Sequence, residues 1–365
     1  MLATPPRDAS PGSKSLRPPP RNVRHPGSPS VTNPPRGSWK NAGSALSRRF
    51  ARRAHAHRAY GARAPNPLAD AAETPLTLSD PELVKLALPK GRMQEGVLQL
   101  LGDAGVRVRV DERGYRPTVS LDHFDAKILK PQNIVGMLHA GARDIGFAGA
   151  DWVAELGADL VELLDTHMDP VRIVAAAPES FLVDGKLPQR HLVVASEYEQ
   201  LTRRWITQRG LDASFLRSWG ATEVLPPEDA DVIVDNAATG STLRANHLQI
   251  VEDLMQSSTR LFAHPRALEA PGRRQRIEDL VVLLRSVLDA RQRVMLELNV
   301  AAKDLERLVA VLPCMRQPTI ARLHGEDAYA VKAAVPHKDL PKLIPILRAS
   351  GGSDIVVQRL AQIVP

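Results

Sequence analysis

The sequence predicts an α/β protein with a largely parallel main sheet, followed by a smaller separate domain. Three observations lead to this prediction. Short apolar runs alternate with amphipathic stretches from residue 83 onward, which is the pattern of repeated βα units. The 365 residues are 43% hydrophobic, which is enough for more than one core. The first 80 residues hold 13 of the 30 prolines and no sustained apolar periodicity, so we expect the fold to begin after them.

The predicted leader, residues 1–82, is expected to be disordered and carries the positive charge of the chain. Its first 80 positions hold 13 of the 48 Lys and Arg residues and 4 of the 41 Asp and Glu residues, so 35 basic and 37 acidic residues remain elsewhere. The rest of the chain therefore carries no excess of positive charge that would favour a nucleic-acid-binding surface, and no nucleic-acid partner is expected. Arg-rich, Ser-rich, acid-poor leaders are typical of organelle transit peptides. An over-long reading frame, with a true start near Leu83, is the alternative.

The single cysteine and the short apolar runs exclude several classes of protein. Cys314 allows neither a disulfide framework nor a cysteine-based metal site, and we expect it to pack as a small hydrophobe. No apolar run approaches the ~18–20 residues that span a membrane, so no membrane partner is expected. We expect a cytoplasmic protein, or one in the plastid stroma if the leader is a transit peptide.

The main α/β part is predicted from apolar periodicity between residues 83 and 294. A strand at 84–88, a turn at 89–92 and a helix from Met93 form the first unit. A helix from Pro131 and a strand at 145–149 form the second, and Asp151 is expected to be the N-cap of the next helix. Further strands are expected at 171–176, 191–195 and 231–234, with helices at 197–208 and 277–294.

The C-terminal segment, residues 290–365, gives the clearest pattern. Its sequence predicts a strand at 294–298, a helix at 305–312, a hairpin of strands 319–323 and 329–335, a helix at 340–347 and a strand at 355–357. The order βαββαβ is the ferredoxin-like arrangement. By fold-level analogy, small domains of this kind often regulate rather than catalyse.

The strongest chemical signal is the segment DVIVDNAATGSTLRAN at residues 231–246. An apolar strand ends in Asp235, and a hydroxyl-rich loop then leads into a helix. Backbone N–H groups and the hydroxyls of Thr239, Ser241 and Thr242 would suit a phosphate monoester, and Gly240 lets the main chain approach it closely. Asp235 can accept hydrogen bonds from ribose hydroxyls or help to hold Mg²⁺. The alternative is a Gly-Ser turn capped by Thr239. The pattern of a P-loop lysine is missing.

Two weaker signals follow other predicted strands, where open α/β sheets bind ligands. The turn Pro89-Lys90-Gly91-Arg92 places two cations that could neutralise a polyphosphate, although such a turn is often only a solvated loop. The stretch from Gly146 to Asp151 is a glycine-spaced turn from strand to helix, for which tight packing and an ordinary helix cap are the alternative.

These three segments together resemble the ATP phosphoribosyltransferases of histidine biosynthesis. The resemblance rests on PKGR at 89–92, DIGFAGAD at 144–151 and DNAATGSTLRAN at 235–246. It runs from about Leu83 to Pro365. The segment 294–363, with Leu312-Pro313 and Gln317-Pro318-Thr319, resembles the C-terminal domain of the long form. Two positions depart from the family pattern: Asn236, where an aliphatic residue is common, and Cys314, where a glycine is usual.

The resemblance implies an architecture and a reaction. Two catalytic lobes related to type II periplasmic binding proteins, 83–171 (completed by about 254–289) and 172–253, would hold the substrates in the cleft between them. N1 of the ATP adenine would attack the anomeric carbon of phosphoribosyl pyrophosphate through an oxocarbenium-like transition state, with Mg²⁺ as the main Lewis acid. The products would be 1-(5-phosphoribosyl)-ATP and pyrophosphate. Feedback inhibition by histidine and self-association to a dimer or homohexamer are also implied.

The resemblance also suggests roles for individual residues. Asp235 and Arg92 are the catalytic candidates, and no metal ligand set is assigned. The phosphoribosyl pyrophosphate site would consist of Asp235, Thr239, Gly240, Ser241 and Thr242. The ATP and pyrophosphate site would consist of Lys90, Gly91, Arg92, Gly149, Asp151, Arg116 and Arg172, with Arg113 as a further cleft residue. Histidine would be held by Asn299 and Thr319, with Asp354 a weaker candidate, although each of these could be a simple cap or turn residue.

Two rival classes share parts of this pattern. A small-molecule-binding protein of the periplasmic type, without catalysis, would need a secretory signal and no hydroxyl phosphate loop, whereas the leader has no apolar core segment. A regulator that binds a metabolite would need an element that reads DNA, and none is evident in the sequence.

Overall fold

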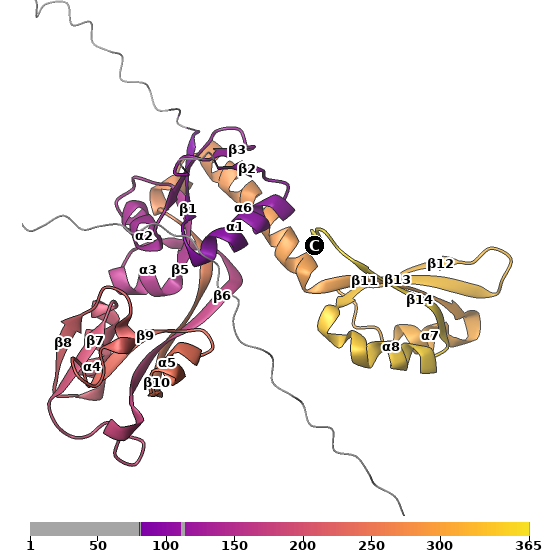
Figure 1. Ribbon diagram of the computed structural model, residues 1–365. Helices are drawn as coiled ribbons and strands as arrows, with labels where there is room; N and C mark the ends of the chain where they lie inside the picture. The colour runs from indigo at the N-terminus through magenta and orange to yellow at the C-terminus, as the bar shows by residue number, and fades with distance from the viewer. Residues whose placement is uncertain (1–79, 81, 111–113, 365) are drawn as a thin grey trace, which may run out of the picture. The chain divides into compact units, whose positions relative to one another are not determined.

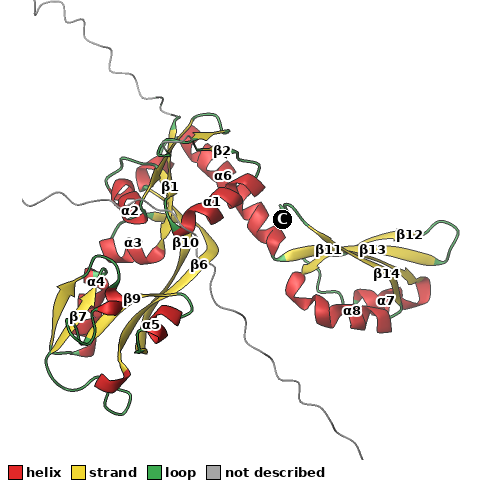
Figure 2. Ribbon diagram, viewed as in Figure 1, coloured by secondary structure: helices red, strands yellow, loops and turns green. Residues whose placement is uncertain are grey.

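The computed structural model describes residues 80, 82–110 and 114–364, and strands alternate with helices along most of this part (Figures 1 and 2). The strands are β1 Val84–Pro89, β2 Val108–Arg109, β3 Thr118–Val119, β4 Phe124–Leu129, β5 Ile145–Gly149, β6 Val161–Pro178, β7 Leu192–Ser196, β8 Ala213–Arg217, β9 Val232–Ala237, β10 Leu248–Ala263, β11 Arg293–Ala301, β12 Thr319–Arg322, β13 Ala328–Pro336 and β14 Gly352–Arg359. The helices are α1 Arg92–Asp103, α2 Pro131–His139, α3 Ala150–Leu156, α4 Glu199–Arg209, α5 Ser241–Ala245, α6 Pro271–Arg291, α7 Leu305–Val309 and α8 Leu340–Ala349. The predicted leader lies outside the described residues except for Asp80 and Glu82.

The large sheet has eight strands in the order β4-β1-β5-β10-β6-β9-β7-β8. At one end β1 runs parallel to β4 and β5, and at the other β7 runs parallel to β8 and β9. Between these ends, β10 and β6 run antiparallel to each other and to their outer neighbours. The sequence predicts the parallel ends but not the antiparallel centre, because the first half of β6 and much of β10 carry charged and hydroxyl residues that hide the apolar signal.

Strands β6 and β10 are 18 and 16 residues long, and they pair along nearly their whole lengths with several register shifts. The predicted strand at 171–176 is thus only the apolar part of a longer strand. Because β10 pairs with β5 and β6 pairs with β9, these two strands join the two parallel ends into one sheet.

Helices cover both faces of the sheet at the end formed by β4, β1 and β5. Leu86 and Leu88 face a core built with α1 and α6, whereas Ala87 faces a core built with α2. Burial on both faces explains why β1 is a continuous apolar run rather than an alternating one. Helix α6 starts six residues before the predicted start at 277, because its first turn is charged and gives no apolar signal.

The other end of the sheet is also covered on both faces. Trp205 of α4 packs on one face of β6, β7 and β9, and Leu243 of α5 packs on the other. Strand β8 forms the edge beside β7. None of the helices in the described part of the chain is both long and apolar enough to cross a membrane.

The C-terminal residues form a four-stranded antiparallel sheet in the order β12-β13-β11-β14. Helices α7 and α8 bury Leu308, Leu343 and Leu347 against Leu296 and its neighbours on one face of this sheet. The predicted βαββαβ order is confirmed, with each strand and helix close to its expected position. Both the α/β fold class and the small second fold are therefore as predicted.

Candidate active site

The loop between β9 and α5 surrounds a cavity of about 250 Å³, which we call the phosphate-loop cavity. Arg92 and Glu223 line it together with the whole of the segment Asp235–Leu243. All five residues predicted to bind phosphoribosyl pyrophosphate thus line one cavity. The loop follows a strand whose apolar residues are fully buried, so the sheet fixes the position at which it begins.

The conformation of this loop depends on its glycine. Gly240 has φ of 70° and is the N-cap of α5, a left-handed conformation that side chains other than glycine disfavour. The hydroxyl of Thr239 donates to Ser241 Oγ at 3.0 Å, while the N–H of Ser241 lies 3.4 Å from Thr239 Oγ1. The alternative in which Thr239 caps the helix therefore rests on one long hydrogen bond, and the hydroxyls of the loop remain at the cavity wall.

Asp235 is a half-buried carboxyl group at the base of the loop. Its Oδ1 accepts hydrogen bonds from the backbone N–H of Asn236 at 2.7 Å and from the Asn236 side-chain amide at 3.2 Å. Burial raises the pKa of Asp235 to about 6; the Asn236 N–H offsets part of that rise, and the carboxylates of Glu223 and Glu197 add to it. The carboxyl group therefore titrates close to neutral pH, where a small change in its surroundings decides its charge.

A second cavity of about 300 Å³, which we call the base cavity, adjoins the first. Its lining comes from both ends of the sheet: Lys90, Arg92, Met93, Pro131, Gly149, Asp151, Trp152, Asp169, Val171, Tyr198, Asn236, Ser257, Ser258 and Thr259. Arg92 and Asn236 line both cavities. The guanidinium group of Arg92 and the side-chain amide of Asn236 thus belong to residues that lie between the two cavities.

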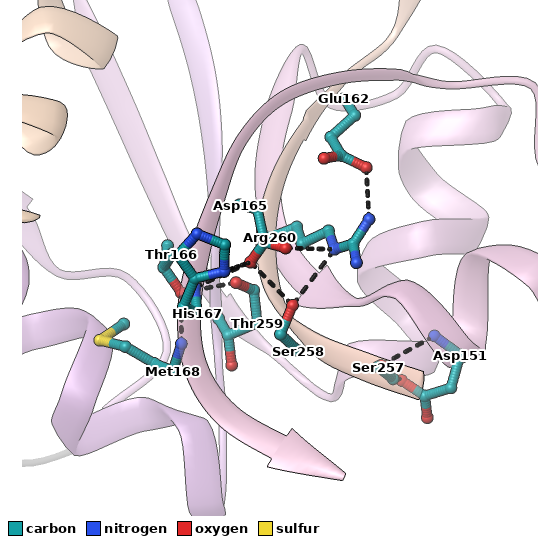
Figure 3. Close-up of polar contacts among 10 residues, drawn as sticks. All are labelled: Asp151, Glu162, Asp165, Thr166, His167, Met168, Ser257, Ser258, Thr259 and Arg260. Atoms are coloured by element: carbon teal, nitrogen blue, oxygen red, sulfur yellow. Dashed lines mark hydrogen bonds and ion pairs between the residues drawn. The ribbon is translucent and has the colours of Figure 1, made fainter. Parts of the chain in front are cut away.

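Asp151 is almost entirely buried in the wall of the base cavity, with 6% of its surface exposed. Its carboxylate accepts hydrogen bonds from Ser257 Oγ at 2.6 Å and from the Tyr198 hydroxyl at 2.8 Å, and its own N–H donates to Ser257 Oγ at 3.0 Å, a contact drawn in Figure 3. Burial, followed by the charge of Asp151, raises the pKa of Tyr198. Asp151 on α3 therefore connects β10 with the first residue before α4 at the cavity.

The predicted N-cap role of Asp151 is wrong. Helix α3 begins at Ala150 with Gly149 as its cap, so Asp151 lies inside the first turn and turns toward β10 instead. A Cβ at position 149 would lie 2.1 Å from Asp151 Oδ1, which explains the glycine. At Gly146 a Cβ would meet Ile134 Cγ2 at 2.7 Å, so tight packing is the reason for that glycine.

The remaining predicted cleft residues are dispersed. Lys90 lines the base cavity, and its Nζ donates to the Tyr115 hydroxyl at 3.1 Å. Gly91, with φ of 89°, caps α1. Arg116 is exposed and Arg172 pairs with both oxygens of Asp253 at 3.0 Å; neither lines the two cavities. Arg113 lies outside the described residues.

The three residues predicted to hold histidine are only partly brought together. Asn299 on β11 donates through its amide to Asp354 Oδ2 on the neighbouring strand β14 at 3.1 Å. Thr319 lies on β12, at the opposite edge of that sheet, with β13 between it and β11. Asn299 and Asp354 therefore form a pair without Thr319.

Several residues that line the base cavity were not predicted from the sequence, most clearly Tyr198, Asp169 and the run Ser257-Ser258-Thr259. Three consecutive hydroxyl residues within a strand are unusual and could have pointed to the site. Figure 3 shows how this run is used: Ser258 donates to Asp165 at 2.8 Å, and Arg260 pairs with Glu162 at 2.7 Å. The hydroxyl run therefore anchors β6 to β10 beside the cavity.

The donor atoms at the phosphate-loop cavity suit a hard cation held largely by a substrate. Among the described side chains, no three or more His, Cys, Asp or Glu residues converge as a metal-binding group. Asp235 and Glu223 nevertheless provide carboxylate oxygens at the cavity wall. Oxygen ligands of this type, one or two at a time beside phosphate groups, are what Mg²⁺ usually takes in enzymes that handle polyphosphates.

Comparison with known proteins gives matches over most of the chain. A family model described as ATP phosphoribosyltransferase matches residues 130–286, and one described as HisG, C-terminal domain, matches residues 290–362. The ATP phosphoribosyltransferase of Chlorobium luteolum is 37% identical over 279 residues, covering 75% of this chain and 95% of the relative. That of Pelotomaculum thermopropionicum is 34% identical over 287 residues, covering 77% and 99%. The solved ATP phosphoribosyl transferase (HisG:HisZ) complex from Thermotoga maritima, with a TM-score of 0.51 and 24% identity over 57% of this chain and 99% of that chain, supports the fold.

Proposed function

The chain belongs to the ATP phosphoribosyltransferase family, and from this premise we propose that its two adjoining cavities hold the two substrates side by side. As a member of this family, the protein joins ATP to phosphoribosyl pyrophosphate in the first step of histidine biosynthesis. In our proposal the phosphate-loop cavity takes the phosphoribosyl group, and the base cavity takes the adenine of ATP. The observation that carries the proposal is the wall of Arg92 and Asn236 common to both cavities.

The residues of the phosphate-loop cavity are suited to each part of phosphoribosyl pyrophosphate. The hydroxyls of Thr239, Ser241 and Thr242 donate to the 5-phosphate, and Gly240 allows the backbone to approach it. The ionised Asp235 carboxylate accepts hydrogen bonds from the ribose hydroxyls. Its negative charge also lies where the ribose becomes positively charged in an oxocarbenium-like transition state, so it stabilises that state more than the bound substrate.

The reaction itself requires positioning more than a protein nucleophile. A bond forms between N1 of adenine and C1′ of the ribose, while the bond from C1′ to the pyrophosphate oxygen breaks and its electron pair leaves with pyrophosphate. Arg92, at the common wall, neutralises the leaving group, and Lys90 adds charge on the ATP side. Asp235 or Glu223 would help to hold a Mg²⁺ ion brought in by the pyrophosphate, and that ion would supply further charge neutralisation. Family membership favours catalysis over a binding protein of the periplasmic type.

An assay with ATP, phosphoribosyl pyrophosphate and Mg²⁺ tests the substrate assignment, because N1-alkylated adenine changes the ultraviolet spectrum. We expect Thr239→Ala and Thr242→Ala to weaken phosphoribosyl pyrophosphate binding about tenfold to a hundredfold, since each removes a hydrogen bond to a charged group. ATP binding should change little. The matched control is Thr207→Ala, whose exposed hydroxyl donates to Arg203 O on α4, far along the chain from the loop. Equal weakening of both substrates would contradict the assignment of the loop.

The C-terminal domain of this family implies feedback regulation by histidine. We further propose that the Asn299–Asp354 pair is part of the histidine site, with Thr319 as a separate candidate, and that the protein assembles as a homohexamer. Asn299→Ala should reduce inhibition by histidine while leaving turnover in its absence unchanged. Sedimentation with and without histidine measures the assembly. Full inhibition of both Asn299→Ala and Thr319→Ala would place the inhibitor elsewhere.

A further inference from the structure

Strand β6 contains a bulge beside the base cavity. Its residues Asp165 and Met168 pair with the consecutive residues Arg260 and Thr259 of β10, so Thr166 and His167 are two extra residues on one strand. Figure 3 shows the polar contacts that hold this stretch: the Thr166 hydroxyl donates to Thr259 O at 2.5 Å, and the Met168 N–H donates to Thr166 Oγ1 at 3.2 Å. Bulges next to active sites often redirect a side chain.

Asp169 lies in the next register shift, where Asp169 and Pro170 face the single residue Ser258 between the pairs Met168–Thr259 and Val171–Ser257. Its backbone has φ of 49°, a left-handed conformation that is uncommon for a residue other than glycine and best tolerated by Asp and Asn. Asp169 lines the base cavity, and its Oδ2 accepts a hydrogen bond from the Thr259 hydroxyl at 2.9 Å. Both strands thus hold the carboxylate at the cavity wall.

The surroundings of Asp169 indicate what kind of group it would meet. Met93, Trp152 and Val171 give the cavity apolar surfaces, which suit the faces of a flat ring. The oxygens of the other wall carboxylate, Asp151, are taken by Ser257 and Tyr198. A phosphate group beside Asp169 would be repelled, whereas an N–H donor on a flat ring would be bound. A purine with an exocyclic amino group has both properties.

We propose that Asp169 accepts a hydrogen bond from the 6-amino group of adenine and thereby selects ATP as the nucleophile. This inference rests on the proposed placement of ATP in the base cavity. When N1 attacks C1′ and pyrophosphate leaves with the bonding electron pair, the adenine becomes positively charged, and the charge is shared over N1, C6 and the 6-amino nitrogen. No proton has to move. The Asp169 carboxylate is adjacent to this growing charge, so its interaction strengthens in the transition state and acts on kcat.

A comparison of ATP with purine riboside triphosphate tests this role, because the analogue keeps N1 and lacks the 6-amino group. We expect Asp169→Asn to lower kcat/KM for ATP about tenfold to a hundredfold, mainly through kcat, as expected for a lost hydrogen bond to a charged group. The same substitution should change pyrophosphate release with the analogue by less than about threefold, because the interaction removed is missing there already. KM for phosphoribosyl pyrophosphate should stay unchanged.

Asp184→Asn is the matched control. Asp184 has nearly the same backbone conformation, with φ of 50°, but is exposed and lines neither cavity. The Asp184→Asn substitution should leave all kinetic constants unchanged. Equal losses with ATP and the analogue would overturn the role of Asp169, as would recovery of the variant by excess Mg²⁺, which would identify the carboxylate as a cation ligand. If the unmodified protein released no pyrophosphate from ATP and phosphoribosyl pyrophosphate, the proposed function itself would fail instead.

Discussion

The contact between α3 and α4 gives a quantitative prediction. Glu155 on α3 is buried, with 4% of its surface exposed. Its two carboxylate oxygens accept hydrogen bonds from the backbone N–H groups of Gln200 and Leu201, both at 3.0 Å. These N–H groups belong to the first turn of α4, where no residue of the same helix can accept from them. Glu155 therefore caps a helix that is 45 residues further along the chain.

Glu155→Gln keeps the shape of the side chain but replaces one acceptor with an NH₂ donor. One partly buried N–H group of α4 then lacks a partner, which costs about 1–3 kcal/mol. The loss of the negative charge at a helix N-terminus adds about 0.3–1 kcal/mol, and up to about 2 kcal/mol in a buried setting. We therefore expect the free energy of unfolding to fall by about 1–5 kcal/mol.

Urea unfolding followed by tryptophan fluorescence measures this loss, since Trp152 lies on α3 and Trp205 on α4. Glu95→Gln is the matched control, because Glu95 is an exposed residue in the first turn of α1, and its loss should cost no more than about 0.5 kcal/mol. If Glu155→Gln proved as stable as Glu95→Gln, the capping argument would be refuted.

Three further predictions concern the site, the packing and the leader. Because the pKa of Asp235 is raised to about 6, kcat/KM for phosphoribosyl pyrophosphate should fall as the pH is lowered below 6, and this decline should vanish in Asp235→Asn. Since the folded state binds that proton more tightly than the unfolded state, the free energy of unfolding should decrease as the pH rises from about 4 to about 6, in the unmodified protein alone. Gly146→Ala places a methyl group 2.7 Å from Ile134 Cγ2 and 2.9 Å from Ala87 Cβ, so thermal unfolding should show a loss of about 1–3 kcal/mol. Removal of residues 1–79 should leave solubility and turnover intact, because that segment has no apolar periodicity that could join a core; an insoluble or inactive product would contradict this.

Elements with a strong apolar signal could be predicted from the sequence. Strand β1 and the entire C-terminal βαββαβ series follow from runs and spacings that local sequence determines. Strand β10 could not be predicted, because Glu252 and Asp253 interrupt its apolar pattern and its pairing partners lie far away in the chain. The large sheet was therefore expected to be more parallel than it is.

Of the candidate site, too, the part built from one continuous segment could be predicted from the sequence, and the part built from distant segments could not. The loop from Asp235 to Thr242 is one continuous segment, so its residues had to lie together. The contact of Tyr198 with Asp151 joins residues 47 positions apart, and only the packing of α3 against α4 brings them together. Asp169 could not be found because its orientation depends on a bulge, and a bulge depends on the register of two strands rather than on either sequence.

The pairing of β6 with β10 bears on how the cleft could open. Proteins with two lobes often open at flexible connecting loops, which bend at little energetic expense. Here both connections are hydrogen-bonded strands that continue into the sheet at either end. Any change in the angle between the ends must therefore twist this ribbon, and the distortion would be spread over many residues. Two of the register shifts in this ladder lie at Ser257–Arg260, so part of this torsion is expected beside the proposed nucleotide site.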